Sequence, residues 1–294
     1  MSCHDAHHMT QSLLDREEYI EQAYFFRVYR ERLEQNTPAQ EILGLIREEI
    51  LATTRLPMAI DFLAAELALH GRVSDGMARL SHYFTPFQTF VVSKAEDEQS
   101  RMDMRIALQV LEREAEYRSE SPEPAAMFVY QFECLARNRL GYDYGLRAVA
   151  GDPLYNDDWR DWIERIRMQL GTVDFADLLY LRSQFHVEEI RRRNRDPEYR
   201  PSYPVLFGIQ EGRIAWANLG KDPLYMFAAL QRQLGYPAVP RSKPASSRPL
   251  FEPAVEMRFQ RLEARLAMLE SETKGEFDLS KFYKEPRVEP SDET

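Results

Sequence analysis

The sequence has very little cysteine. Among its 294 residues only Cys3 and Cys134 are cysteines. Cys3 lies close to the N-terminus and Cys134 falls within an apolar helical pattern, so the two do not resemble the disulfide framework of a small secreted domain. The cysteine usage therefore favours a reducing compartment.

The common catalytic signatures are also missing. The chain contains no Gly-x-Gly-x-x-Gly, no Walker-type Gly-Lys-Ser/Thr loop, no His-Glu-x-x-His and no Gly-x-Ser-x-Gly. These motifs mark dinucleotide-binding, nucleotide-hydrolysing, zinc-protease and serine-hydrolase sites. Their absence leaves an enzyme possible in principle, but the sequence predicts no catalytic residue, no cofactor and no metal ligand.

Long apolar runs are absent as well. The start, "MSCHDAHHMTQSLLDREEY", has no basic region followed by an apolar stretch, which a secretory signal requires. The most apolar stretch, "LPMAIDFLAAELALHG", is interrupted by Asp61 and Glu66 and is too short to span a bilayer. We therefore expect a protein that does not associate with membranes, and by elimination a cytoplasmic one.

The charge balance is acidic. Lys and Arg number 38 against 48 Asp and Glu, which gives a net charge of −10. The stretch "EEIRRRNR" at 188–195 contains a basic cluster that comes directly after two acids. The cluster falls where cations stabilise a helix C-terminus. With this overall charge we expect no nucleic-acid partner. The 44% hydrophobic content is typical of a globular chain.

The residue pattern predicts a mainly α fold. Thr37-Pro38 and Thr85-Pro86 each precede a Gln placed to complete a capping box, and Asn156 and Asp222 are further candidate helix caps. Asp-Pro-Leu-Tyr occurs at 152–155 and 222–225, and shared turn chemistry explains both copies better than duplication does. Helices are predicted at 12–35, 38–53, 57–70, 74–83, 86–118 (with a break near Ser93), 122–139, 156–170, 174–194 and 222–234.

Five segments are predicted along the chain. "VLFGIQ" and "RIAWAN" flank Glu211-Gly212 and predict one small β-hairpin near 205–218. Five prolines between 237 and 253 are typical of a linker. The predicted organisation is a disordered N-terminus at 1–9, a multi-helix domain with the hairpin at 10–236, a Pro-rich linker at 237–253, a short amphipathic helix at 254–272 and a polar tail at 273–294.

Three groups of side chains were weighed as chemical sites. "CHDAHH" at 3–8 holds several potential metal ligands in one hexapeptide, and adventitious binding or none is favoured over a purposeful site. Glu66 and His70 are four apart, which favours a pair at a helix end. His186, with Glu188 and Glu189, offers acid–base chemistry only if the fold supplies a pocket, and a solvated histidine is favoured.

The clearest positive signal is the C-terminal stretch "RFQRLEARLAMLE". In heptad notation its g positions are basic and its e positions acidic, so a parallel pair would match Arg258 with Glu263 and Arg265 with Glu270 of the second chain. About two heptads fit, which is short for an isolated helix. Docking on the chain's own domain therefore stays an equal alternative. The candidate residues for self-association are Val255, Arg258, Phe259, Leu262, Glu263, Arg265, Leu266, Leu269 and Glu270.

Two function hypotheses follow. The first is a non-enzymatic adaptor or assembly subunit that works through protein–protein contacts and self-associates through the C-terminal helix, a possible coiled coil. The alternative is an enzyme of unknown reaction whose pocket forms between the helical bundle and the hairpin.

Overall fold

The computed structural model describes residues 14–97 and 102–241. The chain divides into two units, residues 1–242 and 243–294, and every described residue belongs to the first. Over these ranges the protein is mainly helical and has no named strand, which confirms the predicted α class. The described helices are α1 (Arg16–Glu34), α2 (Ala39–Glu49), α3 (Leu56–His70), α4 (Val73–Arg79), α5 (Pro86–Glu96), α6 (Met104–Ser119), α7 (Pro124–Asn138), α8 (Tyr142–Ala150), α9 (Asp157–Gln169), α10 (Phe175–Tyr180), α11 (Gln184–Asn194), α12 (Ile209–Ala217) and α13 (Pro223–Leu234).

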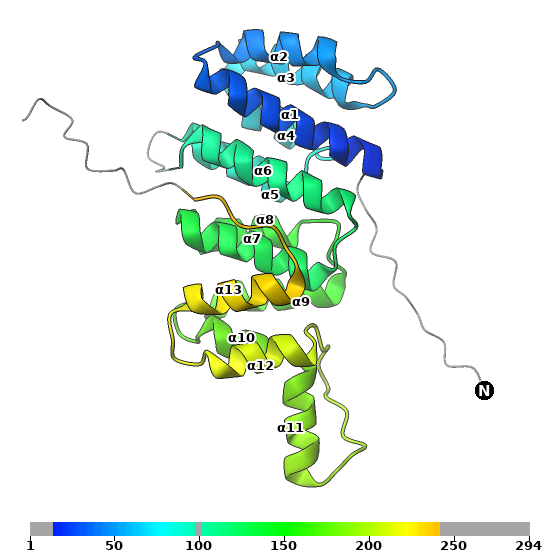
Figure 1. The fold of residues 1–294 in the computed structure, drawn as a ribbon, viewed down its shortest axis with the longest axis vertical. Coiled ribbons are helices and arrows are strands. Elements are labelled where there is room, and N and C mark those ends of the chain that lie inside the picture. The colour runs from blue at the N-terminus through cyan, green and yellow to red at the C-terminus, as the bar shows by residue number, and fades with distance from the viewer. Residues whose placement is uncertain (1–13, 98–101, 242–294) are drawn as a thin grey trace, which may run out of the picture. The chain divides into compact units, whose positions relative to one another are not determined.

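Within this first unit the helices lie in two adjoining rows (Figure 1). One row contains α2, α1, α6, α7, α13 and α12, and the other contains α3, α4, α5, α8, α9 and α10. Contacts between the rows join α2 to α3, α5 to α6, α7 to α8 and α10 to α12. Helix α11 contacts α12 at one end of the rows. The apolar faces of both rows meet in a single buried core.

Most of the predicted helices are present, with ends shifted by a few residues. Two of the predicted helices each contain two helices in the structure. The first, 86–118, breaks between Glu96 and Met104, beyond the break predicted near Ser93. The second, 174–194, is interrupted because Ser183 caps α11 by accepting a hydrogen bond from the His186 amide. Helix α8 was not predicted.

The capping predictions have mixed outcomes. Thr85 and Gln88 form the complete capping box at the start of α5, and Asn156 and Asp222 cap α9 and α13. The matching box at Thr37 is wrong, because α2 begins at Ala39 with Pro38 in the cap position and no side-chain cap. Identical motifs therefore cap a helix in one place and only precede one in the other.

The predicted β-hairpin near 205–218 is wrong. Residues 209–217 form α12, and within the described part of the chain the β pairing near it is an isolated bridge between Ser183 and Phe207. The buried residues of α12 are Glu211, Gly212 and Ala215, which share one face of a helix. Gly212 was interpreted as a turn residue, but it allows close packing: a Cβ there would lie 2.5 Å from the Cβ of Ser183.

A charged network is enclosed between α6, α7 and the turn that follows α8. Arg118 donates to Glu114 at 2.8 Å and also pairs with Asp152, and both carboxylates are fully buried. Gln131 donates to Glu114 at 3.0 Å and to Asp152 at 3.1 Å, and Tyr155 donates to Gln131 at 2.7 Å. Because burial of unpaired charge is costly, this network fixes the two rows to each other.

The repeated Asp-Pro-Leu-Tyr tetrapeptide forms the same hydrogen-bonded turn twice, as shared turn chemistry predicts. The carboxylates of Asp152 and Asp222 accept from the amides of Leu154 at 3.1 Å and Leu224 at 2.9 Å. Each Asp carbonyl also accepts from the amide of the Tyr three residues on, at 3.1 Å in both copies.

Two further groups of hydrogen bonds tie distant segments together. The carboxylate of Glu96, at the end of α5, accepts from the amides of Val73 at 2.5 Å and Ser74 at 3.1 Å and so caps α4. At the other end of the described chain, Tyr236 donates to Glu133 at 2.6 Å, and Asn138 donates to the Pro240 carbonyl at 3.1 Å. The first residues of the predicted linker are thus held on α7 (Figure 1). The remainder of that linker lies outside the described residues.

Candidate functional site

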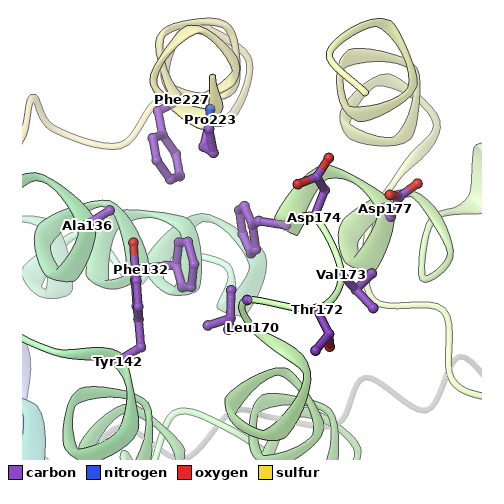
Figure 2. A pocket seen from close by; sticks show the side chains of 12 residues that line it. Phe132, Ala136, Tyr142, Leu170, Thr172, Val173, Asp174, Asp177, Pro223 and Phe227 are labelled. Carbon is purple, nitrogen blue, oxygen red and sulfur yellow. The ribbon is translucent and has the colours of Figure 1, made fainter. Parts of the chain in front are cut away.

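An open pocket lies between α7, the start of α8, α10 and the start of α13. Its volume is about 440 Å³, and the loop at 170–174 closes one side. Figure 2 shows Phe132 and Ala136 contributed by α7, with Pro223 and Phe227 facing them from α13. A cavity of this size, lined in nearly equal parts by polar and apolar surface, can hold a small ligand or a side chain.

Aromatic rings form much of the pocket wall. Phe132 and Phe175 are stacked with ring centroids 3.9 Å apart and an interplanar angle of 11°. Phe132 is also stacked on Tyr142, with ring centroids 5.6 Å apart and an interplanar angle of 19°. Phe132, Phe175 and Phe227 are buried, whereas Tyr142 is 42% exposed. Partial burial raises the pKa of Tyr142, so its phenol stays neutral at physiological pH.

A close helix contact places Tyr142 beside Phe132. Gly145, one turn into α8, faces Leu135 of α7, and a Cβ at Gly145 would lie 2.6 Å and 2.8 Å from the two terminal methyl carbons of Leu135. The missing side chain lets α8 approach α7 closely. Tyr142, at the first position of α8, is thereby held against the pocket.

The charged residues that line the pocket are both acidic. Asp174 stands at the cap position of α10, but its carboxylate accepts no capping hydrogen bond from the helix. Asp177 lies three residues on, half-buried, while Asp174 is exposed. Within the described part of the chain neither carboxylate has an ion-pair partner, whereas the nearby Asp143 is paired with Arg167 at 2.6 Å. The pocket therefore carries unneutralised negative charge.

The residues singled out from the sequence lie elsewhere. Glu66 and His70 do form a helix-end pair at 3.7 Å, with Glu66 also bound to Arg79. Arg191, Arg192 and Arg193 of the basic cluster occupy the last turn of α11, as predicted for a helix end, and Arg195 is its C-cap. The N-terminal cluster "CHDAHH" and the nine candidate residues of the C-terminal helix lie outside the described residues. Across residues 14–97 and 102–241, no group of three or more His, Cys, Asp or Glu side chains is placed to hold a metal ion.

His186 does not line the pocket. Its ring packs against Tyr180 with centroids 4.7 Å apart, and its Nδ1 is buried without a hydrogen-bond partner. Burial lowers the pKa of His186 below its usual value. These surroundings favour the neutral ring.

The surroundings of His186 predict a small pH dependence of stability. Well above pH 6.5 neither the folded nor the unfolded state carries the proton, so His186 has no effect there. As the pH falls through about 6.5 the unfolded chain takes up the proton first, so the free energy of unfolding falls. Urea unfolding between pH 7.5 and pH 5 is expected to show a shallower loss for His186→Gln than for the unmodified chain. Parallel pH profiles would contradict this.

Comparison with family models, with curated proteins and with solved structures finds no match for the chain. No described helix combines the length and apolar character needed to cross a bilayer.

Proposed function

We propose that the protein works through protein–protein contacts, as an adaptor or assembly subunit. The observation that carries this proposal is the open aromatic pocket on a helical framework. Buried networks such as that of Arg118 hold the framework in one arrangement, and a site on rigid elements binds without first having to be ordered.

Several exposed apolar side chains lie close in sequence to residues that line the pocket. Tyr144 is 66% exposed, Met168 75% and Tyr225 71%, and each lies two residues from a residue that lines the pocket. They come from three separate helices, α8, α9 and α13. Residues two apart on a helix do not share a face, so these side chains offer apolar surface for a partner on other faces of the helices that form the pocket.

Self-association through residues 254–272 is the second part of the proposal. It is supported by the complementary charges predicted for Arg258 with Glu263 and for Arg265 with Glu270. With a net charge of −10, a polypeptide partner is favoured over nucleic acid. A cytoplasmic location belongs to the same proposal.

The enzyme hypothesis loses the feature on which it was based. It placed a pocket between the helical bundle and a hairpin at 205–218, but residues 209–217 form α12. The pocket lies instead against α10 and α13, and its ionisable lining side chains are Tyr142, Asp174 and Asp177.

Sedimentation velocity tests self-association. The intact chain is expected to sediment as a dimer or larger species, and a chain truncated after Pro240 as a monomer. Leu262→Asp with Leu266→Asp should dissociate the intact chain, because two charges would replace apolar residues at the heptad contact positions.

The matched control is Gln260→Asp with Ala264→Asp, which adds the same number of carboxylates at outward positions of the same heptads. This control is expected to keep the mass of the intact chain. Identical monomeric masses for the intact and truncated chains would refute self-association. Dissociation by both double variants would show that charge alone, and not the apolar contact, controls assembly.

A further inference from the structure

We propose that the outer face of α3 binds the amphipathic C-terminal segment, residues 254–272, of a second copy of the chain. The inference rests on the proposed self-association and names the surface that receives this segment. Three properties of α3 support it: the exposure of its outer face, the spacing of the apolar side chains there, and the charges beside them.

Helix α3 is apolar on two opposite faces, and only one of them is covered. Its buried residues include Leu56, Ile60 and Leu63, and its neighbours include α2 and α4. On the opposite face Met58 is 69% exposed and Leu69 75%. A helix that is apolar on more than one face is usually enclosed by its neighbours, but α2 and α3 stand at the end of the rows opposite α12 (Figure 1). Among the described residues, this outer face lacks a covering helix.

The apolar residues on the outer face of α3 form one stripe. Met58, Phe62, Ala65 and Leu69 are spaced by four, three and four residues, which places them on the same side of the helix over three turns. Phe62 is half-buried and Ala65 is exposed. The apolar residues of the C-terminal segment recur at the same alternating steps of three and four. Two helices with this spacing pack side by side as a coiled-coil pair.

One antiparallel alignment of the two helices matches their side-chain sizes. It places the small Ala65 opposite the large Phe259 and brings Leu262 opposite Phe62. Large side chains that face small ones interdigitate without leaving voids. Ala65 thus provides the space that Phe259 requires.

A charged residue stands on each side of the stripe. Asp61 lies on one side, and Arg79 of α4 lies on the other with its guanidinium carbon 5.2 Å from the centre of the Phe62 ring. Asp61 pairs with Arg47 and Arg79 pairs with Glu66, but the side chains of Asp61 and Arg79 are both more than half exposed. Each can therefore take a second partner of opposite charge.

The charges of the C-terminal segment match this arrangement when the helices are antiparallel. In that orientation the g positions of two helices flank each other, and so do the e positions. Arg265 then approaches Asp61, and Glu263 approaches Arg79 beside the layer of Leu262 and Phe62. In a parallel orientation Asp61 would face a glutamate of the segment, which is unfavourable. Charge and size thus select the same alignment.

Two copies of the chain complete this contact reciprocally. Each chain has one stripe and one segment, so an exchange of segments gives a closed two-fold dimer with two identical contacts. A single pair of short helices buries less area than a stable interface needs, and the second contact doubles that area. A segment of about two heptads, which is marginal as an isolated helix, is stabilised by the folded surface that receives it.

Full-length chains that lack one half of the contact test the inference by sedimentation velocity. Met58→Glu with Leu69→Lys removes the stripe without changing the net charge, and each new charge suits the end of α3 at which it lies. Leu262→Asp with Leu266→Asp removes the apolar face of the segment. Each double variant alone is expected to be a monomer, and an equimolar mixture of the two is expected to form a 1:1 dimer. Because only one of the two contacts remains, this dimer should be at least about tenfold weaker than that of the unmodified chain.

The matched control makes the same substitutions at exposed apolar positions of other helices. Met168→Glu with Tyr225→Lys alters side chains of α9 and α13 that are as exposed as those of the stripe. This variant is expected to dimerise like the unmodified chain. Thermal unfolding followed by circular dichroism checks that every variant is folded.

An exchange of side-chain size tests the alignment. Ala65→Phe keeps the stripe apolar but fills the space opposite Phe259, so it is expected to weaken dimerisation by about tenfold or more. Phe259→Ala alone should also weaken it, whereas the two substitutions together should restore most of the affinity. If Ala65→Phe dimerised more tightly than the unmodified chain, the alignment would be wrong and the inference overturned.

Three results of the mixing experiment would also overturn the inference. A dimeric stripe variant would show that the C-terminal segments pair with each other, which keeps self-association and removes the role of α3. A dimeric segment variant would show that two stripes pair with each other. A mixture that stays monomeric at the highest concentration would show that the two halves do not bind. A monomeric unmodified chain, by contrast, would refute self-association itself, so the failure of the two proposals is distinguishable.

Discussion

Replacing Arg118 with Met is expected to lower the free energy of unfolding by about 3–5 kcal/mol. Among the described residues, the guanidinium is the one positive charge paired with the carboxylates of Glu114 and Asp152, both of which are fully buried. Met fills a similar space but leaves these carboxylates without a counter-charge in the core. Urea unfolding followed by circular dichroism measures the loss.

The matched control lies on the same helix. Arg113 forms an exposed ion pair with Glu116 at 3.2 Å, and Arg113→Met is expected to cost less than about 1 kcal/mol. Adding Glu114→Gln to Arg118→Met should recover part of the lost stability, because one buried charge is removed. Equal costs for Arg118→Met and Arg113→Met would show that the buried network does not hold the helices together.

Gly212→Ala is expected to destabilise the protein by about 2 kcal/mol. The new Cβ would lie 2.5 Å from the Cβ of Ser183 and 2.7 Å from the Cβ of Phe185. Ser183 cannot easily turn away, because its hydroxyl donates to the Tyr180 carbonyl at 2.7 Å and accepts from the His186 amide at 3.2 Å. Thermal and urea unfolding of the variant provide the measurement.

A second helical glycine gives the opposite expectation. Gly44 lies inside α2, and a Cβ there would meet nothing within 4 Å. Gly44→Ala should therefore stabilise the protein by up to about 1 kcal/mol through helix propensity alone. If Gly212→Ala also stabilised the protein, the close packing of α12 against the start of α11 would be disproved.

Local signals carried the part of the fold that the sequence predicted correctly. Thr85, Asn156 and Asp222 act on amides two or three residues away, so their effect can be read from a short stretch. The hairpin prediction was wrong because it rested on the β-branched and aromatic residues around Gly212. The conformation of this segment depends on packing against a tertiary neighbour, Ser183. Tertiary packing determined the secondary structure of that segment, and such packing involves residues distant in sequence.

The pocket could not be predicted from sequence patterns, because it is also formed by residues distant in sequence. Phe132, Tyr142, Phe175 and Phe227 come from four helices, and no spacing in the chain connects them. Helix α8, which presents Tyr142, was itself missed. One local signal was present in the sequence, because Asp174 and Asp177 are three residues apart. Acids near a helix start are common for reasons of the helix dipole, so this spacing does not by itself indicate a pocket.

The cap that Glu96 provides for α4 has a consequence for the order of folding. Helix α4 is seven residues long and has no cap from its own flanking residue, Arg72. Its first amides are satisfied by a carboxylate that lies more than twenty residues later in the chain. A helix this short does not persist alone in water. Nascent α4 must therefore wait for α5 to be made and docked, so these two neighbours fold as one cooperative step.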